Sequence, residues 1–176
     1  METDGMDRLS IALDSFRCYR DDDIETFLRQ KALNFLDRGW CSIYLLVDEE
    51  LFDKGSINIL GYFTLSHKSL IPEGASKSTI KKASGMSGSE SIHFVLIGQL
   101  GRYLERKPDG SIIAGISGKE LLDRAFEVIH AASELIPCRC VLVECSDNKK
   151  VHQFYLDNRF SKFQHDGEHL QFYKRI

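Results

Sequence analysis

The sequence contains few residues that interrupt secondary structure or cross-link the chain. Only three of its 176 residues are proline, and it contains no tract of low complexity, so an intrinsically disordered chain is excluded. No apolar run approaches the roughly 18 residues that a membrane-spanning helix needs. The five cysteines are an odd number in a chain that is not small, which argues against a disulfide framework. We therefore expect a cytoplasmic protein without a membrane partner.

Neither a metal site nor a strong net charge stands out. Cys138 and Cys140 are one residue apart, but no second Cys or His pair follows at a zinc-finger spacing, so we expect no metal. The first seven residues are acidic and lack the order of a signal peptide. Lys and Arg total 23 against 26 Asp and Glu, a net charge of −3. This balance disfavours a dedicated nucleic-acid binder, although it leaves a local basic patch open.

The length and composition predict one domain over residues 1–176, with a mixed α/β sheet covered by helices. A helix is expected over residues 24–36, capped by Asp21–Asp23 and ended by Gly39. Residues 48–56 are predicted to form a hairpin loop and residues 71–91 a long loop. The remaining expected strands are 42–47, 58–67, 92–100, 139–145, 161–164 and 169–174, and the remaining expected helices are 119–136 and 148–158.

One segment has the composition of an anion site. Gly115 and Gly118 allow close approach or a positive φ, and the free N–H groups at the start of the next helix favour phosphate. Lys119 adds a positive charge. The segment is not a Walker loop, because Glu120 stands where that motif needs Ser or Thr, and it is not a dinucleotide fingerprint. A phosphate cradle and an ordinary helix start both fit.

The order and spacing of several segments resemble the GNAT superfamily of acyl-CoA N-acyltransferases. The segments are Leu96–Leu100, Gly118–Leu122 and Asn148-x-x-Val151-x-x-Phe154-Tyr155-x-x-Asn158-x-Phe160. Phe16–Cys18, Ile43–Leu46 and Leu60–Ser66 are similar to the N-terminal half of one branch, which includes bacterial toxins that acetylate charged tRNA. The resemblance covers most of the chain. It implies an α/β fold with a central mixed sheet of six to seven strands and about four helices.

The resemblance also implies an acetyl-CoA-dependent acetyltransferase and the residues of its site. The pantetheine arm would pair with the backbone of Leu100, Gly101 and Arg102 and contact Asn148. Tyr155 would lie near the thioester sulfur as the general acid, a role that suits a phenol protonated at pH 7; packing beside Phe154 is its other interpretation. The pyrophosphate would lie on the amides of a loop made of Ile113, Ala114, Gly115, Ile116, Ser117, Gly118 and Lys119.

Two departures and one gap accompany the resemblance. Ile113 and Ile116 stand where the family has Gln or Arg and the first Gly, which leaves the tightness of CoA binding open. Arg159 replaces a Gly; at positive φ it would be strained by roughly 1 kcal/mol. Glu144 is the candidate general base, and a satisfied polar residue at a strand end is its alternative. We expect His93, in an apolar run, to be a hydrogen-bonded core histidine.

Three functions fit the sequence. The first is an N-acetyltransferase acting on a primary amine of a small molecule, peptide or protein. The second is a toxin-like acetyltransferase of aminoacyl-tRNA, favoured by the N-terminal resemblance and disfavoured by the net charge. The third is a non-catalytic domain that binds CoA or a partner. The acceptor, the acyl chain length and the oligomeric state, including a homodimer through edge strands, are left open.

Overall fold

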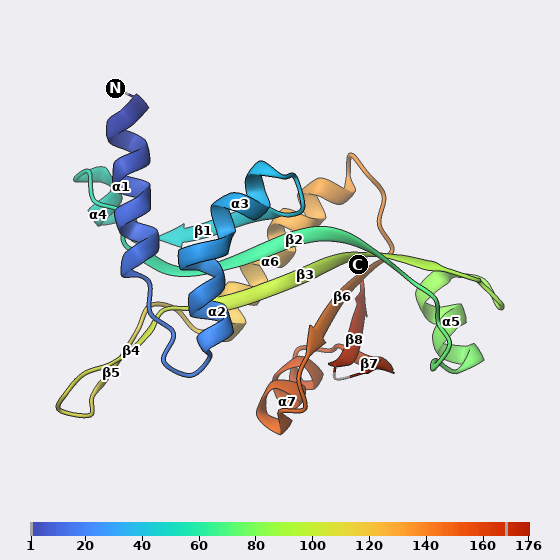
Figure 1. Ribbon diagram of the computed structural model, residues 1–176. Coiled ribbons are helices and arrows are strands. Elements are labelled where there is room, and N and C mark those ends of the chain that lie inside the picture. The colour runs from blue at the N-terminus through green and yellow to red at the C-terminus, as the bar shows by residue number, and fades with distance from the viewer. Residues whose placement is uncertain (1, 168) are drawn as a thin grey trace. The chain divides into compact units, whose positions relative to one another are not determined.

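The computed structural model describes residues 2–167 and 169–176 and contains a six-stranded mixed sheet (Figure 1). The strand order is β1-β2-β3-β6-β8-β7, and β4 and β5 form a separate hairpin. The strands are β1 (Ser42–Val47), β2 (Ile59–Leu70), β3 (Ile92–Arg102), β4 (Leu104–Arg106), β5 (Ile112–Ala114), β6 (Cys140–Cys145), β7 (Ser161–Asp166) and β8 (His169–Arg175). The helices are α1 (Glu2–Ser15), α2 (Asp22–Thr26), the π-helix η1 (Phe27–Lys31), α3 (Ala32–Asp37), α4 (Glu49–Asp53), α5 (Lys77–Ser84), α6 (Gly118–Ser133) and α7 (Lys149–Asp157). None of these helices is long and apolar enough to cross a membrane.

The chain divides into two compact units. The first comprises the residues up to Thr64 together with Gln99–Ala125, and the second comprises Leu65–Gly98 and Phe126–Ile176. Each is described by itself below. The expectation of one domain over residues 1–176 stays a prediction.

The core of the first unit lies between its N-terminal helices and β2. Phe16 and Tyr62 are fully buried there and meet edge to face, with ring centroids 5.5 Å apart. The Tyr62 hydroxyl donates a hydrogen bond to the Ile24 carbonyl at 2.7 Å, so the buried phenol is satisfied. The sequence analysis did not predict α1, although Ala12, Leu13 and Phe16 recur at helical spacing and are all buried.

The predicted helix over residues 24–36 exists but is interrupted. Asp21 is its N-cap, as expected: its carboxylate accepts the N–H groups of Asp23 and Ile24 at 3.1 and 3.2 Å. The five residues of η1 then widen the helix before α3 begins at Ala32. Apolar spacing alone cannot reveal such a π-helical segment.

Two segments predicted as loops contain helices. Asp48 caps α4 by accepting the Leu51 N–H at 3.1 Å, and Ser76 caps α5 by accepting the Thr79 N–H at 3.1 Å. Gly85 ends α5 in the left-handed conformation, with φ of +88°. The short segment 77–84 forms α5, whose Ala83 packs in a core cluster with residues of β3 and β6. The prediction for residues 71–91 was therefore wrong.

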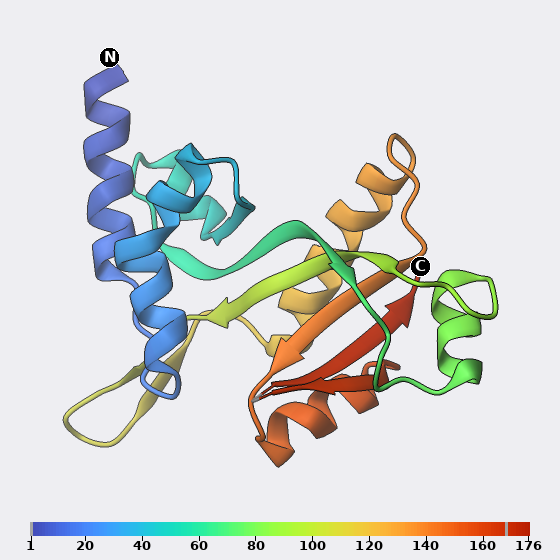
Figure 2. The same cartoon turned by 45° about the vertical axis from the view of Figure 1, so that its right-hand side comes forward.

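The second unit is built on β6. Val95–Ile97 of β3 pair in parallel with Val141–Val143, and β8 pairs antiparallel along the whole of β6. One face of this part of the sheet is covered by α5, in a cluster that includes Ala83, Leu142 and Tyr173. The other face is covered by α7 (Figure 2). Its side chain Tyr155 meets Phe172 of β8 there. Side chains on β6 alternate between the two faces.

Candidate active site

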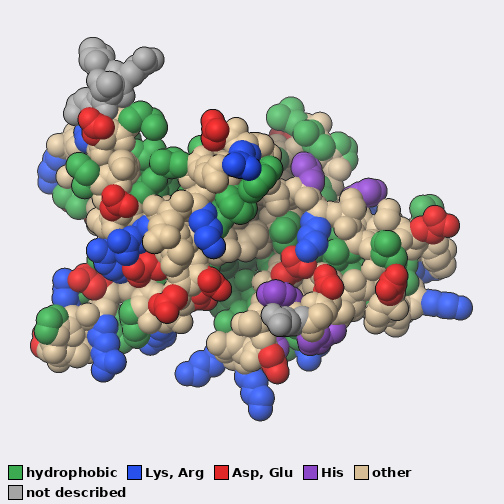
Figure 3. Space-filling model, viewed as in Figure 1, with side chains coloured by type: hydrophobic (Ala, Val, Ile, Leu, Met, Phe, Trp, Pro, Cys, Tyr) green, Lys and Arg blue, Asp and Glu red, His purple; other side chains and the backbone are tan. Residues whose placement is uncertain are grey.

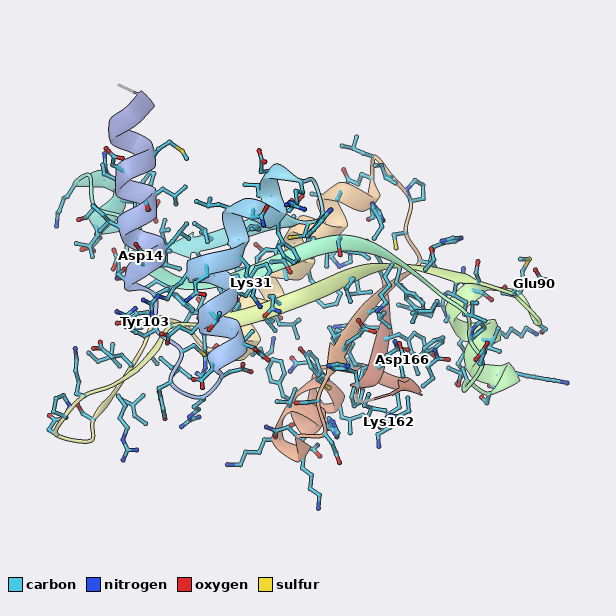
Figure 4. The ribbon with its side chains drawn as sticks, viewed as in Figure 1. Asp14, Lys31, Glu90, Tyr103, Lys162 and Asp166 are labelled. Atoms are coloured by element: carbon cyan, nitrogen blue, oxygen red, sulfur yellow. The ribbon has the colours of Figure 1, made fainter. Side chains whose placement is uncertain are left out.

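In the first unit, the loop predicted to bind pyrophosphate begins within β5, the second strand of the β4–β5 hairpin. Tyr103, labelled in Figure 4, donates its N–H to the Leu60 carbonyl at 2.9 Å and accepts the Gly115 N–H at 3.0 Å. A Cβ on Gly115 would lie 2.4 Å from the Leu60 oxygen. Glycine is therefore required at position 115 because the β2 backbone passes so close. A ligand is not needed to explain it.

At the end of the loop, the start of α6 offers backbone donors. The Ser117 hydroxyl accepts the Glu120 N–H at 3.1 Å, and the Ser117 carbonyl accepts the Leu121 N–H at 3.0 Å. The amides of Gly118 and Lys119 come first in the helix, where N–H groups have no intrahelical partner. These two amides can bind an anion.

Side chains contribute less to this loop than its backbone does. The Lys119 ammonium bonds both Asp123 oxygens at 2.9 and 2.6 Å, so part of its charge is neutralised within α6. Ile113 is 45% exposed and Ala114 is also exposed, and neither offers a side-chain donor. Ile116 is half-buried. A pyrophosphate here would depend on main-chain N–H groups and the helix dipole.

The end of β3 is shaped by packing. A Cβ on Gly101 would lie 2.3 Å from Cγ2 of Ile24 and 2.6 Å from Cε1 of Tyr62, so the core admits only glycine there. Leu100 and Arg102, on either side, are half-buried. That the backbone of these three residues pairs with the pantetheine arm stays a prediction.

In the second unit, Asn148 is the N-cap of α7. Its side-chain oxygen accepts the N–H groups of Lys150 and Val151 at 3.0 and 3.4 Å. This structural role is enough to explain an Asn at position 148. The Nδ2 group is the part of the side chain that this cap does not use, so the predicted contact with the pantetheine arm would have to come from it.

Tyr155 lies on the inner face of α7 and is 8% exposed. Its ring meets Phe160 at 5.3 Å and Phe172 at 6.0 Å between centroids. Burial, and to a smaller degree the nearby Cys145, raises the pKa of Tyr155 well above its ordinary value of 10. Burial also raises the pKa of the Cys145 thiol, to about 11. Tyr155 is therefore fully protonated at neutral pH, the state in which a phenol can donate a proton or a hydrogen bond.

The turn after α7 contains a strained residue. Arg159 has a φ of +65° and is the one non-glycine residue of positive φ in the described part of the chain. The condition set for strain at Arg159, a positive φ, is met; that Arg stands in place of a glycine stays a prediction. Its side chain is exposed, so the strain lies in the backbone.

Glu144, the predicted general base, is held in a polar cluster with Lys68 and Gln171. The Lys68 ammonium bonds the two carboxylate oxygens at 2.8 and 2.7 Å, and the Gln171 amide donates to one of them at 2.6 Å. Gln171 is fully buried, and its own Oε1 has no hydrogen-bond partner among the described residues. Both carboxylate oxygens of Glu144 are therefore engaged.

Glu144 and Tyr155 are not on the same face of the sheet. Tyr155 lies near Cys145, and Cys145 and Glu144 are consecutive residues of β6, whose side chains point to opposite faces. The structure therefore does not bring together the two side chains that the sequence analysis proposed as catalytic.

Lys68 and Gln171 were not predicted as residues of the site. A single Lys near the end of a predicted strand carries no signal of its own. Its pairing with Glu144 depends on a strand order that local patterns do not specify. His93 is hydrogen-bonded as expected, to the Ser69 hydroxyl at 2.6 Å. Its predicted place in the core was wrong, because β3 alternates between buried and exposed positions and His93 is exposed. Within the described residues, no group of three or more His, Cys, Asp or Glu side chains is placed to hold a metal.

Comparison with known proteins establishes the fold. No protein-family model and no curated protein matches the chain. A solved structure of a bacterial toxin matches with a TM-score of 0.70 at 18% identity, covering 94% of this chain and 83% of that one. The toxin AtaT complexed with acetyl-methionyl-tRNAfMet matches with a TM-score of 0.70 at 22% identity, over 93% and 86% of the two chains. AtaTR with acetyl-CoA bound matches over the same shares with a TM-score of 0.68 at 22% identity.

The chain has the fold of these toxins. The predicted fold class, a GNAT-like mixed sheet of six strands flanked by helices, is confirmed. More helices are present than the four expected, because α4 and α5 lie in predicted loops and the first predicted helix is divided. The resemblance to the toxin branch, which rested on scattered short segments, extends over nearly the whole chain.

Proposed function

We propose that this protein transfers the acetyl group of acetyl-CoA to a primary amine. The observation that carries the proposal is the fold shared with AtaTR bound with acetyl-CoA, over 93% of this chain and 86% of that one. The exposed start of α6 and the buried, protonated Tyr155 agree with it.

The residues of the first unit fit a cofactor held by its phosphates. In the proposal the amides of Gly118 and Lys119 bind the pyrophosphate, and the loop from Ile113 to Ser117 borders it. The backbone of Leu100, Gly101 and Arg102 and the Nδ2 group of Asn148 bind the pantetheine arm. Because Ile113 supplies no donor, we expect weaker binding than a loop with Gln or Arg would give.

Tyr155 is the proposed group that assists departure of the thiolate. In the reaction the amine nitrogen bonds the carbonyl carbon, the carbon–sulfur bond breaks, the amine loses one proton and the sulfur gains one. Burial keeps Tyr155 protonated and also makes it a weaker acid, so in the proposal its hydroxyl hydrogen-bonds the developing charge on sulfur and gives up its proton only once the thiolate has formed. The buried ring is fixed by its aromatic neighbours, which favours a defined donor direction.

Glu144, the base expected from the sequence, lies on the other face of the sheet from Tyr155, and both its carboxylate oxygens are engaged by Lys68. In the proposal an ordered water therefore accepts the amine proton. Glu144→Gln should keep most of the activity, and loss of activity in a variant of unchanged stability would restore Glu144 as the base.

An aminoacyl-tRNA is the second candidate acceptor. It is favoured by the match to AtaT complexed with acetyl-methionyl-tRNAfMet, whose fold this chain shares at a TM-score of 0.70. The net charge of −3 does not favour a large phosphate-rich substrate. On the face drawn in Figure 3, basic and acidic side chains are interspersed.

Thermal unfolding with and without acetyl-CoA tests the cofactor half of the proposal. A ligand bound only to the native state raises the midpoint, so the wild type should shift and Gly118→Asp, with a carboxylate at the anion site, should not. Gly5→Asp is the matched control, because nothing lies within 4 Å of a Cβ at Gly5. No shift in folded wild type at about millimolar acetyl-CoA would contradict the proposal and favour a non-catalytic domain.

An acceptor screen follows if the shift is seen. Release of free CoA is measured with small amines, peptides and aminoacyl-tRNA, with Tyr155→Phe as the control. Acetylation of aminoacyl-tRNA alone would select the second candidate, and acetylation of small amines or peptides would select the first.

A further inference from the structure

A pocket in the second unit takes no part in the reaction proposed above. Its volume is about 620 Å³, within the range of small-molecule sites. It lies between the end of β2, the start of β3, the turn after α5 and the segment 136–139. None of the residues that line it belongs to the set proposed for acetyl-CoA.

Basic and hydroxyl side chains dominate the polar part of the pocket. Its basic residues are His67, Lys68, His93 and Arg139, and its hydroxyls are Ser69, Ser84, Ser89 and Ser91. Among the described residues, none that lines the pocket carries a carboxylate. Glu90, between two of the serines, lies at the far turn between α5 and β3 (Figure 4). The Lys68 charge is shared with Glu144, so Arg139 is the main source of positive charge.

One basic group of the pocket is held by a hydrogen bond, and a second lies against the turn after α5. The His93 ring is oriented by its 2.6 Å hydrogen bond between Nδ1 and the Ser69 hydroxyl, which leaves Nε2 to face a ligand. The Arg139 guanidinium lies against Gly85, where a Cβ would be 3.3 Å from Cζ. That glycine has a φ of +88°, a backbone conformation that other residues rarely adopt. Glycine therefore allows the turn that ends α5 to lie close to the guanidinium. Fixed donors lose little entropy when they bind an anion.

Apolar side chains also line the pocket. Met86 and Ile136 are 67% and 65% exposed, and with Pro137 they form the set called the Met86–Ile136 wall below. A guanidinium fork matches the oxygens of a phosphate, and an apolar wall suits a flat ring. A phosphorylated nucleoside combines both features and fits a volume of this size.

We propose that this pocket binds a nucleotide, with Arg139 and His93 donating to the phosphate and the Met86–Ile136 wall against the base. A free nucleotide and a nucleotide unit of an RNA strand carry the same chemistry. The site goes beyond the acetyl-CoA site and does not depend on it.

Calorimetric titration of AMP, inorganic phosphate and a short single-stranded RNA tests the proposal. Arg139→Gln should weaken binding by about tenfold, the usual effect of losing one charge-assisted contact. Arg106→Gln, which removes an exposed arginine of β4 outside the pocket, should leave the affinity unchanged. Gly118→Asp should also leave it unchanged. His93→Phe tests the same phosphate contact from β3 and replaces Arg139→Gln if that variant unfolds.

Each outcome decides the proposal. The proposal is supported if AMP binds and Arg139→Gln weakens that binding. Tighter binding of AMP than of inorganic phosphate supports contact of the base with the apolar wall. Binding of RNA but not AMP, with the same sensitivity to Arg139, supports it with a strand as the source. Absence of binding up to about 10 mM, binding that Arg139→Gln and His93→Phe leave unchanged, or loss of binding in Gly118→Asp would overturn it.

Discussion

Burial determines the chemistry of single residues in this protein, and Tyr155 is the clearest case. Its hydroxyl stays protonated because the surroundings disfavour a phenolate. Tyr155→Phe keeps the ring contacts and removes only the donor, so we expect kcat to fall by about 10²- to 10⁴-fold with an unchanged midpoint of unfolding. A fall in both would identify Tyr155 as a packing residue.

The pH dependence follows from the same burial. The proposed reaction needs the protonated phenol, and a pKa raised above 10 moves the loss of that form to higher pH. Deprotonation of Tyr155 should therefore cause no alkaline decline in kcat up to about pH 10. A decline centred near pH 9 that is absent from Tyr155→Phe would contradict the raised pKa.

Arg159 represents backbone strain at a single position. Its φ of +65° costs an L-residue roughly 1 kcal/mol, which glycine avoids. Arg159→Gly should raise the free energy of unfolding by at most about 0.5 kcal/mol, because the entropy of glycine in the unfolded chain offsets most of the relieved strain. Arg159→Ala, strained in the same way, should bring no gain in a chemical denaturation series.

At the scale of the element, the residues of the loop between β5 and α6 have different roles: some are structural, and others are proposed to bind the ligand. Gly115 packs on the β2 backbone, so Gly115→Ala should destabilise the fold by about 1–3 kcal/mol, with or without acetyl-CoA. Gly5→Ala has open space for its Cβ and should not destabilise. A stable Gly115→Ala variant that fails to bind acetyl-CoA would instead show that Gly115 serves the ligand.

Asn148 at the start of α7 allows a similar separation. Asn148→Ala removes the cap and should cost about 1 kcal/mol of unfolding free energy. Asn148→Asp keeps an acceptor oxygen for the cap but lacks Nδ2, so stability should be retained while KM for acetyl-CoA rises. Equal KM values for Asn148→Asp and wild type would remove Asn148 from the proposed cofactor contacts.

For the whole molecule, net charge bears on the choice of acceptor. A chain of charge −3 can bind tRNA only through local basic groups, and those contacts release counterions. KM for aminoacyl-tRNA should therefore rise steeply between about 50 and 200 mM salt, while KM for a small amine should change little. Steady-state rates measured over this salt range test the prediction. A KM for aminoacyl-tRNA that does not change with salt concentration would exclude phosphate contacts.

Local patterns in the sequence determined most of the fold. The strands with β-branched runs, the cap at Asp21 and the helix start near Gly118 all follow from neighbours a few residues apart. Those interactions act within one turn or one strand, so they are readable without a tertiary structure. The order of the motifs then sufficed to predict the GNAT-like sheet.

The tertiary structure alone decided which residues meet. Gly115 is explained by Leu60, and Glu144 by Lys68 and Gln171, each far away in the sequence. The separation of Glu144 from Tyr155 follows from the alternation of β6 combined with the side on which α7 packs. Strand order and helix placement result from burial of apolar surface over the whole chain, which no short pattern records.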